Sequence, residues 1–587
     1  GSIMLEILDE QCTGCTMCGQ LCPTGAIQFE IKDGFRYPKV VRNKCINCDL
    51  CNKRCPAKNN NIEKNSFPKV YAGWINDEEQ RINCTSGGIL FELSKFFLEN
   101  NGYVAGVAWT DDYKNAKYEL IHEYKELYRI TQTKYFQPEM SEIFVQIKEK
   151  LDKGSKVLFI GTSCSNAGLK SFLNREYNNL YCCDFVCRGY TSQLYHQKRV
   201  QELESAKGSK VKGIFYKNKS IGWEQFGTKF DFENGESYYV NRYDDPYEYM
   251  LQINDYVTRT SCFECKYRDS HRITDITVGD FWGIKGLPKD AYKKGVSAIL
   301  INSKKGEILL SAIDSQIQKE ERSLWELAKG NHCLLGQLPF NSGREIFYED
   351  LQNLTINEIH KKYGNITSYK NEKRMKKVKK VIYYLLHINI ISFVKYNFLN
   401  LNVIRDKGKY LIPFRGTCVN IEKNGSIILH SNLILNALKH KGSRDQTFLH
   451  IYPDGKLIVN GRVRFAATSS VDILPGGTIE LGELDSNYGT VIVCANKISI
   501  DDGAEFGRNV IIYDSNFHPT KLNKATFGRP LIIERHVWLC TGVCVTKGLT
   551  IGEGSICSIN SSITKNVKPR SMVMGNPAKC VMEDVEW

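Results

Sequence analysis

The residues of this sequence best suited to chemistry are its cysteines, 22 among 587 residues. Near the amino terminus they follow the spacing C-x2-C-x2-C-x3-C-P, and the whole run occurs a second time. Three thiolates at two-residue spacing can hold one face of an iron–sulfur cube, while the fourth cysteine of each run reaches the other cluster. The spacing therefore predicts two 4Fe–4S clusters, one held by Cys12, Cys15, Cys18 and Cys55 and the other by Cys22, Cys45, Cys48 and Cys51.

A pair of zinc knuckles is the alternative for closely spaced cysteines, although zinc sites seldom use this run twice. The segment resembles the bacterial two-cluster ferredoxins, and residues 1–62 are predicted to form a ferredoxin-like two-cluster module. The resemblance implies one-electron transfer, with a ferredoxin or another electron donor on one side and an electron acceptor on the other.

A third group of four cysteines follows apolar runs, in loops rich in glycine or in turn-forming residues. Two of them form another C-x2-C pair, and the four together can hold a third 4Fe–4S cluster. By spacing alone, a zinc clip with two buried thiols explains them equally well. The four residues are Cys164, Cys187, Cys262 and Cys265.

Residues 63–366, which carry this third group, alternate between strand and helix patterns. Apolar runs at 103–109 and 157–161 are typical of buried strands, and the amphipathic stretch 143–151 is typical of a helix. The alternation predicts a mixed α/β domain. No G-x-G-x-x-G follows a strand, so the sequence does not support a Rossmann dinucleotide site.

Several stretches of this domain resemble, in order, the coenzyme F-420 hydrogenase/dehydrogenase beta-subunit family. The resemblance rests on residues 81–88, 134–137, 161–164 (G-T-S-C), 187–189, 261–266, 275–283 (D-I-T-V-G-D-F-W-G) and 295–297. It implies FAD held by glycine-rich loops, with an iron–sulfur cluster beside it. Matched by position, the flavin contacts are Ser86, Gly87, Gly88, Lys134, Tyr135 and Thr162.

From the residues alone, Gly87 and Gly88 suit a turn before a helix, and Lys134 suits a solvated surface. Where the family has C-H-G, this sequence has Arg188 in the middle position. An arginine there favours binding of an anionic substrate or a flavin phosphate over proton transfer. Use of the deazaflavin itself is therefore doubtful, and we expect a ferredoxin-fed reduction of another substrate.

Residues 367–400 are predicted to form a basic and apolar linker helix. Six cations between 373 and 380 precede an apolar run at 381–391. That run is too short to span a bilayer, but it suits the interface of a membrane with anionic headgroups. A linker helix with solvated lysines is the alternative.

Residues 401–587 show a six-residue rhythm, which is clearest at Ile533, Leu539, Val545, Ile551, Cys557 and Ile563. Such a period places one flat β face in each repeat and three faces in each coil, as in a parallel β-helix. The irregular stretch 515–530 is expected to interrupt the coils as a loop. Cysteines at inward positions are expected to be packing residues, namely Cys494, Cys540, Cys544 and Cys557.

This region resembles the left-handed β-helix hexapeptide acyltransferases, especially the sugar O-acetyltransferases. The likeness rests on residues 514–518, 537–539 and 548–555 and on M-G-N-P-A-K at 574–579. It implies a homotrimer with acetyl-CoA in the groove between neighbouring β-helices. At the matching positions His518 is the general base, oriented by Asp514, and an exposed loop histidine is the alternative. Weaker candidates for CoA contact are Trp538, Lys547, Pro577 and Lys579.

Composition and charge exclude several classes of protein function and structure. The excess of 79 basic over 65 acidic residues is diffuse for this length, so we expect no nucleic-acid binding. With 42% hydrophobic and 25% charged residues, wholesale disorder is excluded. The lack of a signal-like amino terminus and of a spanning apolar run predicts a cytoplasmic protein, with peripheral attachment to the inner membrane face through the linker as an option.

The three resemblances together predict a bifunctional enzyme, in which an iron–sulfur flavoprotein oxidoreductase is fused to an acetyl-CoA-dependent O-acetyltransferase. By association, its substrate is a small-molecule or lipid-linked sugar of surface polysaccharide biosynthesis. The alternative is an electron-transfer subunit of a larger redox complex, with the β-helix serving trimerisation. A scaffold with structural clusters is the third interpretation.

Overall fold

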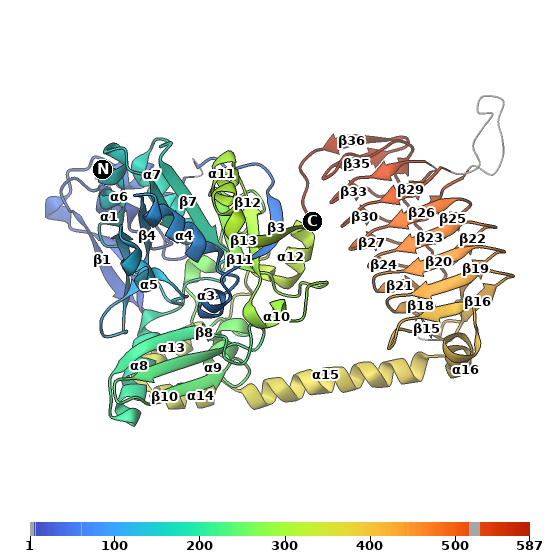
Figure 1. The fold of residues 1–587 in the computed structure, drawn as a ribbon, viewed down its shortest axis with the longest axis horizontal. Coiled ribbons are helices and arrows are strands. Elements are labelled where there is room, and N and C mark those ends of the chain that lie inside the picture. The colour runs from blue at the N-terminus through green and yellow to red at the C-terminus, as the bar shows by residue number, and fades with distance from the viewer. Residues whose placement is uncertain (1–4, 6, 60–61, 441, 516–528, 547) are drawn as a thin grey trace. The chain divides into compact units, whose positions relative to one another are not determined.

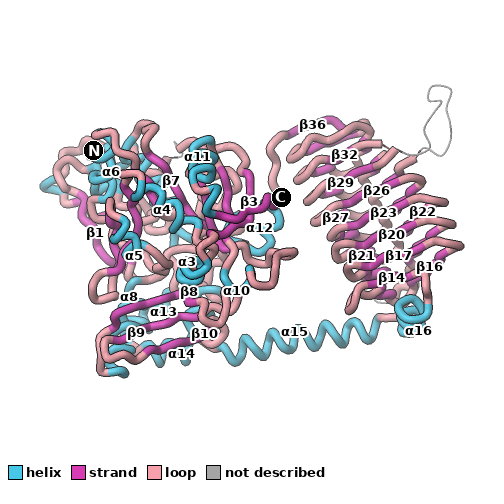
Figure 2. Tube along the Cα trace, viewed as in Figure 1, coloured by secondary structure: helices cyan, strands magenta, loops and turns pink. Residues whose placement is uncertain are grey.

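The computed structural model describes residues 5, 7–59, 62–440, 442–515, 529–546 and 548–587. The chain divides into two compact units, Gly1–Asn371 and Glu372–Trp587. The first mixes helices and strands, whereas the second begins with a helical segment and continues as strands and loops (Figures 1 and 2). In the described part of the chain, no helix combines the length and the apolar composition needed to cross a bilayer.

The amino-terminal module of the first unit is a β hairpin with short helical turns. Strands β1 (Ile27–Lys32) and β2 (Phe35–Val40) pair antiparallel around Asp33 and Gly34, both at positive φ as a two-residue turn requires. A side chain at Gly34 would lie 2.5 Å from the backbone nitrogen of Leu194, so the hairpin tip packs tightly on α8 (Gln193–Lys207). The turns are α1 (Met17–Leu21), η1 (Arg42–Lys44) and α2 (Leu50–Lys53).

A mixed eight-stranded sheet, in the order β13-β3-β12-β11-β7-β6-β4-β5, forms the centre of the first unit. Successive residues Leu158 and Phe159 enter two different apolar clusters, because side chains alternate across a strand. The prediction of a mixed α/β domain is therefore confirmed. The strands are β3 (Lys69–Ile75), β4 (Tyr103–Trp109), β5 (Ala116–Ile121), β6 (Val157–Ile160), β7 (Leu180–Phe185), β11 (Ile276–Asp280), β12 (Ser297–Ile301) and β13 (Ile317–Arg322).

A smaller antiparallel sheet, β10-β9-β8, packs within a separate apolar cluster of the same unit. Its strands are β8 (Val211–Asn218), β9 (Gly227–Phe232) and β10 (Ser237–Asn241). The remaining longer helices of the unit are α3 (Glu78–Asn83), α4 (Ile89–Glu99), α6 (Ile143–Asp152), α7 (Ser163–Leu173), α9 (Pro246–Gln252), α11 (Lys304–Ala312), α12 (Leu324–Gly330), α13 (Arg344–Asn353) and α14 (Ile356–Tyr363).

The second unit begins within α15 (Ile366–His387), continues through α16 (Ile390–Val394) and the turn η6 (Lys395–Leu399), and then forms a left-handed parallel β-helix, as predicted. Ile533 pairs with Ile551 of the next coil, three six-residue repeats along the chain. The inward residues predicted from Ile533 to Ile563 are at most 1% exposed, so the ladder is the core. Cys494 and Cys557 are buried within it, whereas Cys540 and Cys544, also predicted to point inward, are only partly buried.

Three parallel sheets form the faces of the β-helix (Figure 1). The first face contains β14 (Val403–Arg405), β17 (Ser426–Leu429), β20 (Lys456–Val459), β23 (Thr478–Leu481), β26 (Lys497–Ile500), β29 (Leu531–Ile533) and β32 (Thr550–Ile551). The second contains β15 (Leu411–Pro413), β18 (Leu433–Ala437), β21 (Val463–Ala466), β24 (Leu484–Ser486), β27 (Ala504–Phe506), β30 (Trp538–Leu539), β33 (Ile556–Cys557), β35 (Met572–Gly575) and the antiparallel β36 (Ala578–Met582). The third contains β16 (Thr417–Ile421), β19 (Thr447–Ile451), β22 (Ser470–Ile473), β25 (Val491–Cys494), β28 (Ile511–Tyr513), β31 (Cys544–Val545) and β34 (Ser562–Ile563).

Two neighbouring isoleucines of β29 test the ladder. Ile533 is fully buried, and truncating it to alanine removes packed methyl groups, so Ile533→Ala should lower the free energy of unfolding by about 2–5 kcal/mol. Ile532 is 38% exposed and points outward, so Ile532→Ala should cost less than about 1 kcal/mol. Urea unfolding of the full chain, followed by circular dichroism, measures both. Equal losses would contradict the assigned inward register.

Candidate redox and acyl-transfer sites

The first predicted cysteine set comes together around the start of α1. Cys12, Cys15, Cys18 and Cys55 lie within electrostatic range of one another. Burial, with a smaller contribution from the neighbouring thiols of Cys12 and Cys55, raises the pKa of the Cys15 thiol to about 12. Four buried thiolates need a cationic centre between them, so this donor set fits a metal cluster. The second set lies nearer the solvent, since Cys48 is exposed.

The structure also gathers the third set, although its members come from three separate segments of the chain. Cys164, Cys187, Cys262 and Cys265 interact electrostatically, and burial raises the pKa of Cys187 to about 12 and of Cys262 to about 11. The close approach of this loop to Cys262 requires a glycine at position 189. Its φ is 135°, and a Cβ there would lie 3.1 Å from Cβ of Cys262.

The sulfur spacing in these sets can be compared with that around a single zinc ion. Thiolates bound at about 2.3 Å to one tetrahedral zinc ion lie only about 3.8 Å apart. Among the described residues, which include every cysteine, no three cysteine sulfurs lie within 4.8 Å of one another. The third set therefore lacks the compact sulfur spacing that a bound zinc ion requires.

Helix α7 connects the first and third sets. Cys164 lies in its first turn, and one turn later Gly168 packs on Cys15, where a Cβ would lie 2.9 Å from Cβ of Cys15. The partly buried Tyr267 lies close to both sets. Burial raises the pKa of its hydroxyl, and the nearby thiols of Cys164 and Cys15 add to this rise. Protein atoms therefore bridge the two sets.

Arg259 is a fully buried cation at the same boundary. Its guanidinium donates hydrogen bonds to the carbonyl oxygens of Cys12 (2.9 Å) and Arg36 (3.0 Å) and to Oε1 of Gln137 (2.9 Å). Its charge opposes the rise in pKa that burial causes in both Cys12 and Cys262. The arginine thus holds the amino-terminal module on the α/β domain and favours thiolates on both sides.

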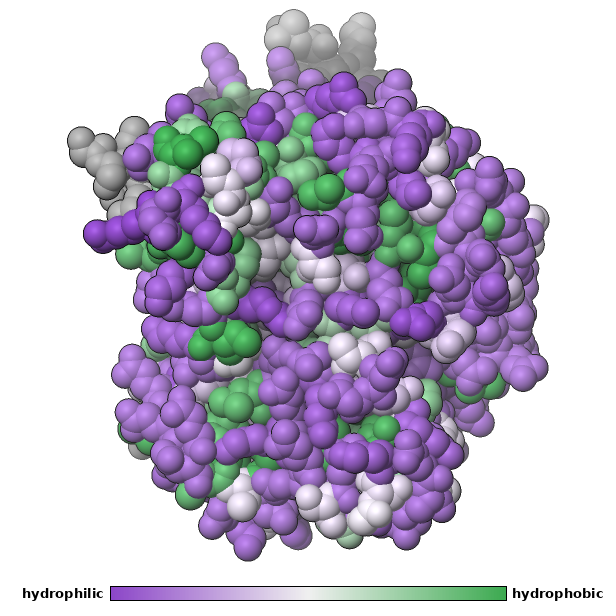
Figure 3. All heavy atoms as spheres, turned by 90° about the vertical axis from the view of Figure 1, so that its left-hand side faces the viewer, coloured by the Kyte–Doolittle hydropathy of each residue, from purple (hydrophilic) through white to green (hydrophobic). Residues whose placement is uncertain are grey.

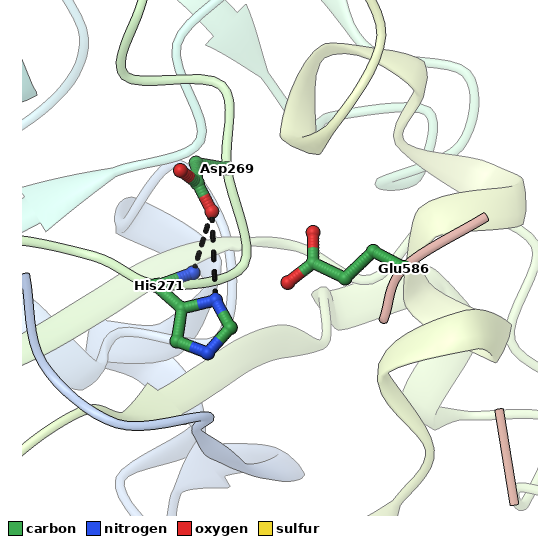
Figure 4. A group of neighbouring side chains, drawn as sticks. All are labelled: Asp269, His271 and Glu586. Atoms are coloured by element: carbon green, nitrogen blue, oxygen red, sulfur yellow. Dashed lines mark hydrogen bonds and ion pairs between the residues drawn. The ribbon is translucent and has the colours of Figure 1, made fainter. Parts of the chain in front are cut away.

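The chain that follows Cys262 and Cys265 is held in place by polar contacts. The backbone N–H of His271 donates to Oδ1 of Asp269 at 2.9 Å, and the imidazole lies beside the same carboxylate (Figure 4). Arg272 then forms an ion pair with the buried carboxylate of Asp184 at 2.7 Å. These contacts fix the loop that supplies two ligands of the third set.

A cavity of about 300 Å³ lies against the third set, with Cys187 in its wall. This volume is at the lower end of the range for ligand sites. Gly87 lies just behind the wall, where a Cβ would come within 2.5 Å of the Gly73 carbonyl oxygen. The other five predicted flavin contacts line the cavity, namely Ser86, Gly88, Lys134, Tyr135 and Thr162.

Two helices begin at this cavity, and both supply backbone N–H groups for an anion. Gly88, at φ 89°, precedes α4, and Thr162 caps α7 by accepting the N–H of Ser165. Lys134 donates from Nζ to the carbonyl oxygen of Thr131 at 2.7 Å, and burial lowers the pKa of Lys134 to about 7. This arrangement fits the pyrophosphate of a flavin dinucleotide.

Sequence reasoning missed an ion pair in the cavity wall. Lys217 of β8 pairs with Asp280 at the end of β11, and Nε1 of Trp223 donates to the same carboxylate at 2.7 Å. Lys217 also interacts with Tyr135. Asp280 stands in a motif that carried the family resemblance, but Lys217 lies in an ordinary strand pattern, and only the tertiary fold joins them.

Arg188 differs from the expectation that it binds an anionic substrate or a flavin phosphate. Its guanidinium forms an ion pair with Asp255 at 3.0 Å and donates to the carbonyl oxygens of Leu251 and Gln252. A carboxylate already compensates its charge. The side chain therefore fixes the end of α9 against the loop of Cys187.

In the β-helix, His518 and Lys547 lie outside the described residues. Asp514, the expected partner of His518, is fully buried, and its carboxylate accepts the backbone N–H of Ala495 at 2.6 Å and of Asn496 at 2.7 Å. Asp514 therefore anchors the corner at which the interrupting stretch begins.

The described candidates for CoA contact share one face of the β-helix. Trp538 lies on β30 and forms part of a hollow of about 560 Å³ that also contains Asp485 and Glu505. Pro577 and Lys579 belong to the β35–β36 hairpin of the same sheet and do not line that hollow.

Comparisons with known proteins match all three parts of the chain. Residues 11–59 match the 4Fe–4S dicluster domain, and residues 154–324 match the C terminus of the coenzyme F-420 hydrogenase/dehydrogenase beta subunit. The carboxy-terminal region matches acetyltransferases. The three resemblances found in the sequence are therefore confirmed.

The similar proteins are each matched over only part of this chain. Nodulation protein L of Rhizobium meliloti is 35% identical over 97 residues, 16% of this chain and 52% of the relative. Galactoside O-acetyltransferase of Escherichia coli is 26% identical over 112 residues, 18% of this chain and 55% of the relative. The chain thus spans about half the length of the curated relatives it matches. A chain of the F-420-reducing NiFe hydrogenase complex of Methanosarcina barkeri is 18% identical, with 46% of this chain and 90% of that chain covered and a TM-score of 0.33.

Iron content tests the third set. Three 4Fe–4S clusters require about twelve iron atoms per chain, and Cys262→Ser should lower this to about eight while the ferredoxin-type absorbance remains. Cys333→Ser, which alters a partly buried thiol outside the three sets, should leave iron unchanged. Iron and protein assays on anaerobically purified protein give both numbers. Eight atoms in the unaltered protein would contradict a third cluster.

Proposed function

We propose that this chain is a bifunctional enzyme, an iron–sulfur flavoprotein oxidoreductase fused to an acetyl-CoA-dependent O-acetyltransferase. One observation carries the redox half: Cys187 of the third set lies in the wall of the cavity lined by the flavin candidates, and the set shares α7 and Tyr267 with the first set. Electrons would enter at the exposed second set, cross the first and third sets, and reach the cavity.

FAD is the proposed cofactor of this cavity, where it would exchange single electrons with a cluster and electron pairs with a substrate. The amino-terminal ends of α4 and α7 would face its pyrophosphate, and Lys134 would supply positive charge. Lys217, held by Asp280 and next to Tyr135, is positioned to keep a positive charge at the cavity wall, because both neighbours raise its pKa. The electron donor is proposed to be a ferredoxin or a similar one-electron protein.

In the transferase half, His518 is proposed to take the proton from an acceptor hydroxyl as its oxygen attacks the thioester carbon of acetyl-CoA. The carbon–sulfur bond then breaks, and CoA leaves as its thiol. We propose a sugar as the acceptor, on the strength of similarity to a galactoside O-acetyltransferase. Surface polysaccharide biosynthesis, a trimeric assembly and a cytoplasmic location are part of the same proposal.

The pKa of Lys134 gives the flavin proposal a pH signature. Burial lowers this pKa to about 7, so the ammonium charge is present below pH 7 and is lost as the pH rises through 7. The affinity for FAD should therefore fall between pH 6 and 8, by at most about tenfold per pH unit. Lys134→Met should flatten this dependence, whereas the exposed Lys153→Met should not. Flavin fluorescence titration measures the affinity for FAD at each pH. An affinity that rises with pH would contradict the assignment of Lys134 to the flavin site.

Removing the proposed general base tests the transferase half. His518→Ala should lower kcat/KM for acetyl transfer by about 100- to 10,000-fold, the usual contribution of general-base catalysis. The half-exposed His430→Ala on the same β-helix is the control. Release of CoA thiol in the presence of candidate sugars reports the rate, and the iron–sulfur spectrum should be unchanged. Retained activity would refute the role of His518.

The nature of the substrate can be tested with both halves present. The protein is incubated anaerobically with a reductant, acetyl-CoA and candidate nucleotide sugars, and the products are read by mass spectrometry. A gain of an acetyl group, of two hydrogens or of both separates the two activities. Neither change with any sugar would argue against a sugar substrate.

A further inference from the structure

The helix α15 presents two unlike faces along its exposed length. Every residue from 370 to 383 is exposed. Met375, Val378, Ile382 and Leu385 recur at spacings of three and four residues, so they share one face of the helix. The six cations are Lys373, Arg374, Lys376, Lys377, Lys379 and Lys380, and most of them lie on the other faces.

Exposed apolar residues also follow the end of α15 in the sequence. The helix is anchored on the β-helix by Tyr384, which packs against Phe414. Beyond it, Ile391 is 83% exposed and Leu401 is 95% exposed. Further exposed apolar residues of this segment are Leu386, Ile390, Val394, Phe398, Leu399 and Ile404. We call the exposed apolar residues between 375 and 404, with the six cations, the basic apolar segment.

Such a concentration of exposed apolar side chains is unusual in a protein surface. By contrast, hydrophilic side chains cover most of the face drawn in Figure 3, where hydrophobic ones gather in small separate groups. Leaving the basic apolar segment in water costs free energy, so it points to a partner that accepts apolar side chains and positive charge together.

A second copy of the helix is a poor partner for this face. The spacing of Met375, Val378, Ile382 and Leu385 has the form of a coiled-coil seam, but the flanking positions hold Arg374 and Lys379. In a parallel pair these like charges would face each other and repel. The helix carries only Glu372 as a carboxylate among these cations, and that residue is paired with Lys376.

We propose that the basic apolar segment binds the surface of a membrane containing anionic phospholipids. The helix lies in the plane of the interface, with its apolar face among the upper acyl chains. The lysines extend to the headgroup phosphates, because their long stems can follow the apolar surface while the ammonium groups stay in the polar layer. This binding is independent of either proposed activity.

Vesicle co-sedimentation of the full-length protein tests the proposal. Binding to vesicles of phosphatidylcholine with phosphatidylserine should exceed binding to phosphatidylcholine alone, and salt should weaken it. The combined variant Lys373→Gln, Lys377→Gln, Lys379→Gln and Lys380→Gln should reduce the affinity by at least about tenfold. The apolar variant Ile382→Gln with Leu385→Gln should also reduce it, since both side chains are exposed and the fold does not depend on them.

Matched variants separate a specific segment from general basicity. The control Lys212→Gln, Lys289→Gln, Lys423→Gln and Lys565→Gln removes the same charge from exposed sites elsewhere. The control Ile308→Gln with Ile346→Gln alters two exposed helical isoleucines. Both controls should bind like the unaltered chain. The proposal is overturned by an absence of binding, by equal binding to neutral vesicles, by equal losses in the controls, or by segment variants that change only the oligomeric state.

Discussion

The arrangement of the first unit depends on the cost of burying many thiolates close together. Cys12, Cys15, Cys18 and Cys55 form one set of buried and partly buried thiols, and Cys164, Cys187, Cys262 and Cys265 form another set that is partly buried. Metal centres would offset most of the repulsion, and Arg259 adds a buried positive charge between the two sets. That guanidinium also donates hydrogen bonds to backbone carbonyls of the amino-terminal module. The same side chain therefore offsets the negative charge of the thiolates and holds the module on the α/β domain.

Helix α7 connects the flavin candidates to both cysteine sets. Thr162 caps α7, Cys164 lies in the first turn of that helix, and Gly168 meets Cys15 one turn later. One short helix therefore joins the cavity, the third set and the first set. The β-helix solves an independent problem, since its core is a ladder of buried aliphatic residues that requires none of the redox machinery.

The parts that could be predicted from the sequence are those that depend on local spacing. The double cysteine run and the six-residue ladder from Ile533 to Ile563 are periodic, and the period fixes which side chains meet. Other features depend on parts of the chain that are distant in sequence, and no local pattern predicts them. They are the pairing of Lys217 with Asp280 and the positions of Arg259 and Tyr267. The pairing of Arg188 with Asp255 likewise joins residues distant in sequence, whereas the arginine type alone suggests an anionic ligand. His518, which the resemblance named, lies outside the described residues.

The central claim is that the third cysteine set carries electrons from the ferredoxin-like module to the flavin. Stopped-flow absorbance tests it directly, with FAD-loaded protein mixed anaerobically with a low-potential one-electron reductant. We predict that cluster bleaching precedes flavin bleaching in the unaltered chain. In Cys262→Ser the ferredoxin-type clusters should still be reduced while flavin bleaching slows by orders of magnitude. Flavin reduction at the same rate in both proteins would contradict the account.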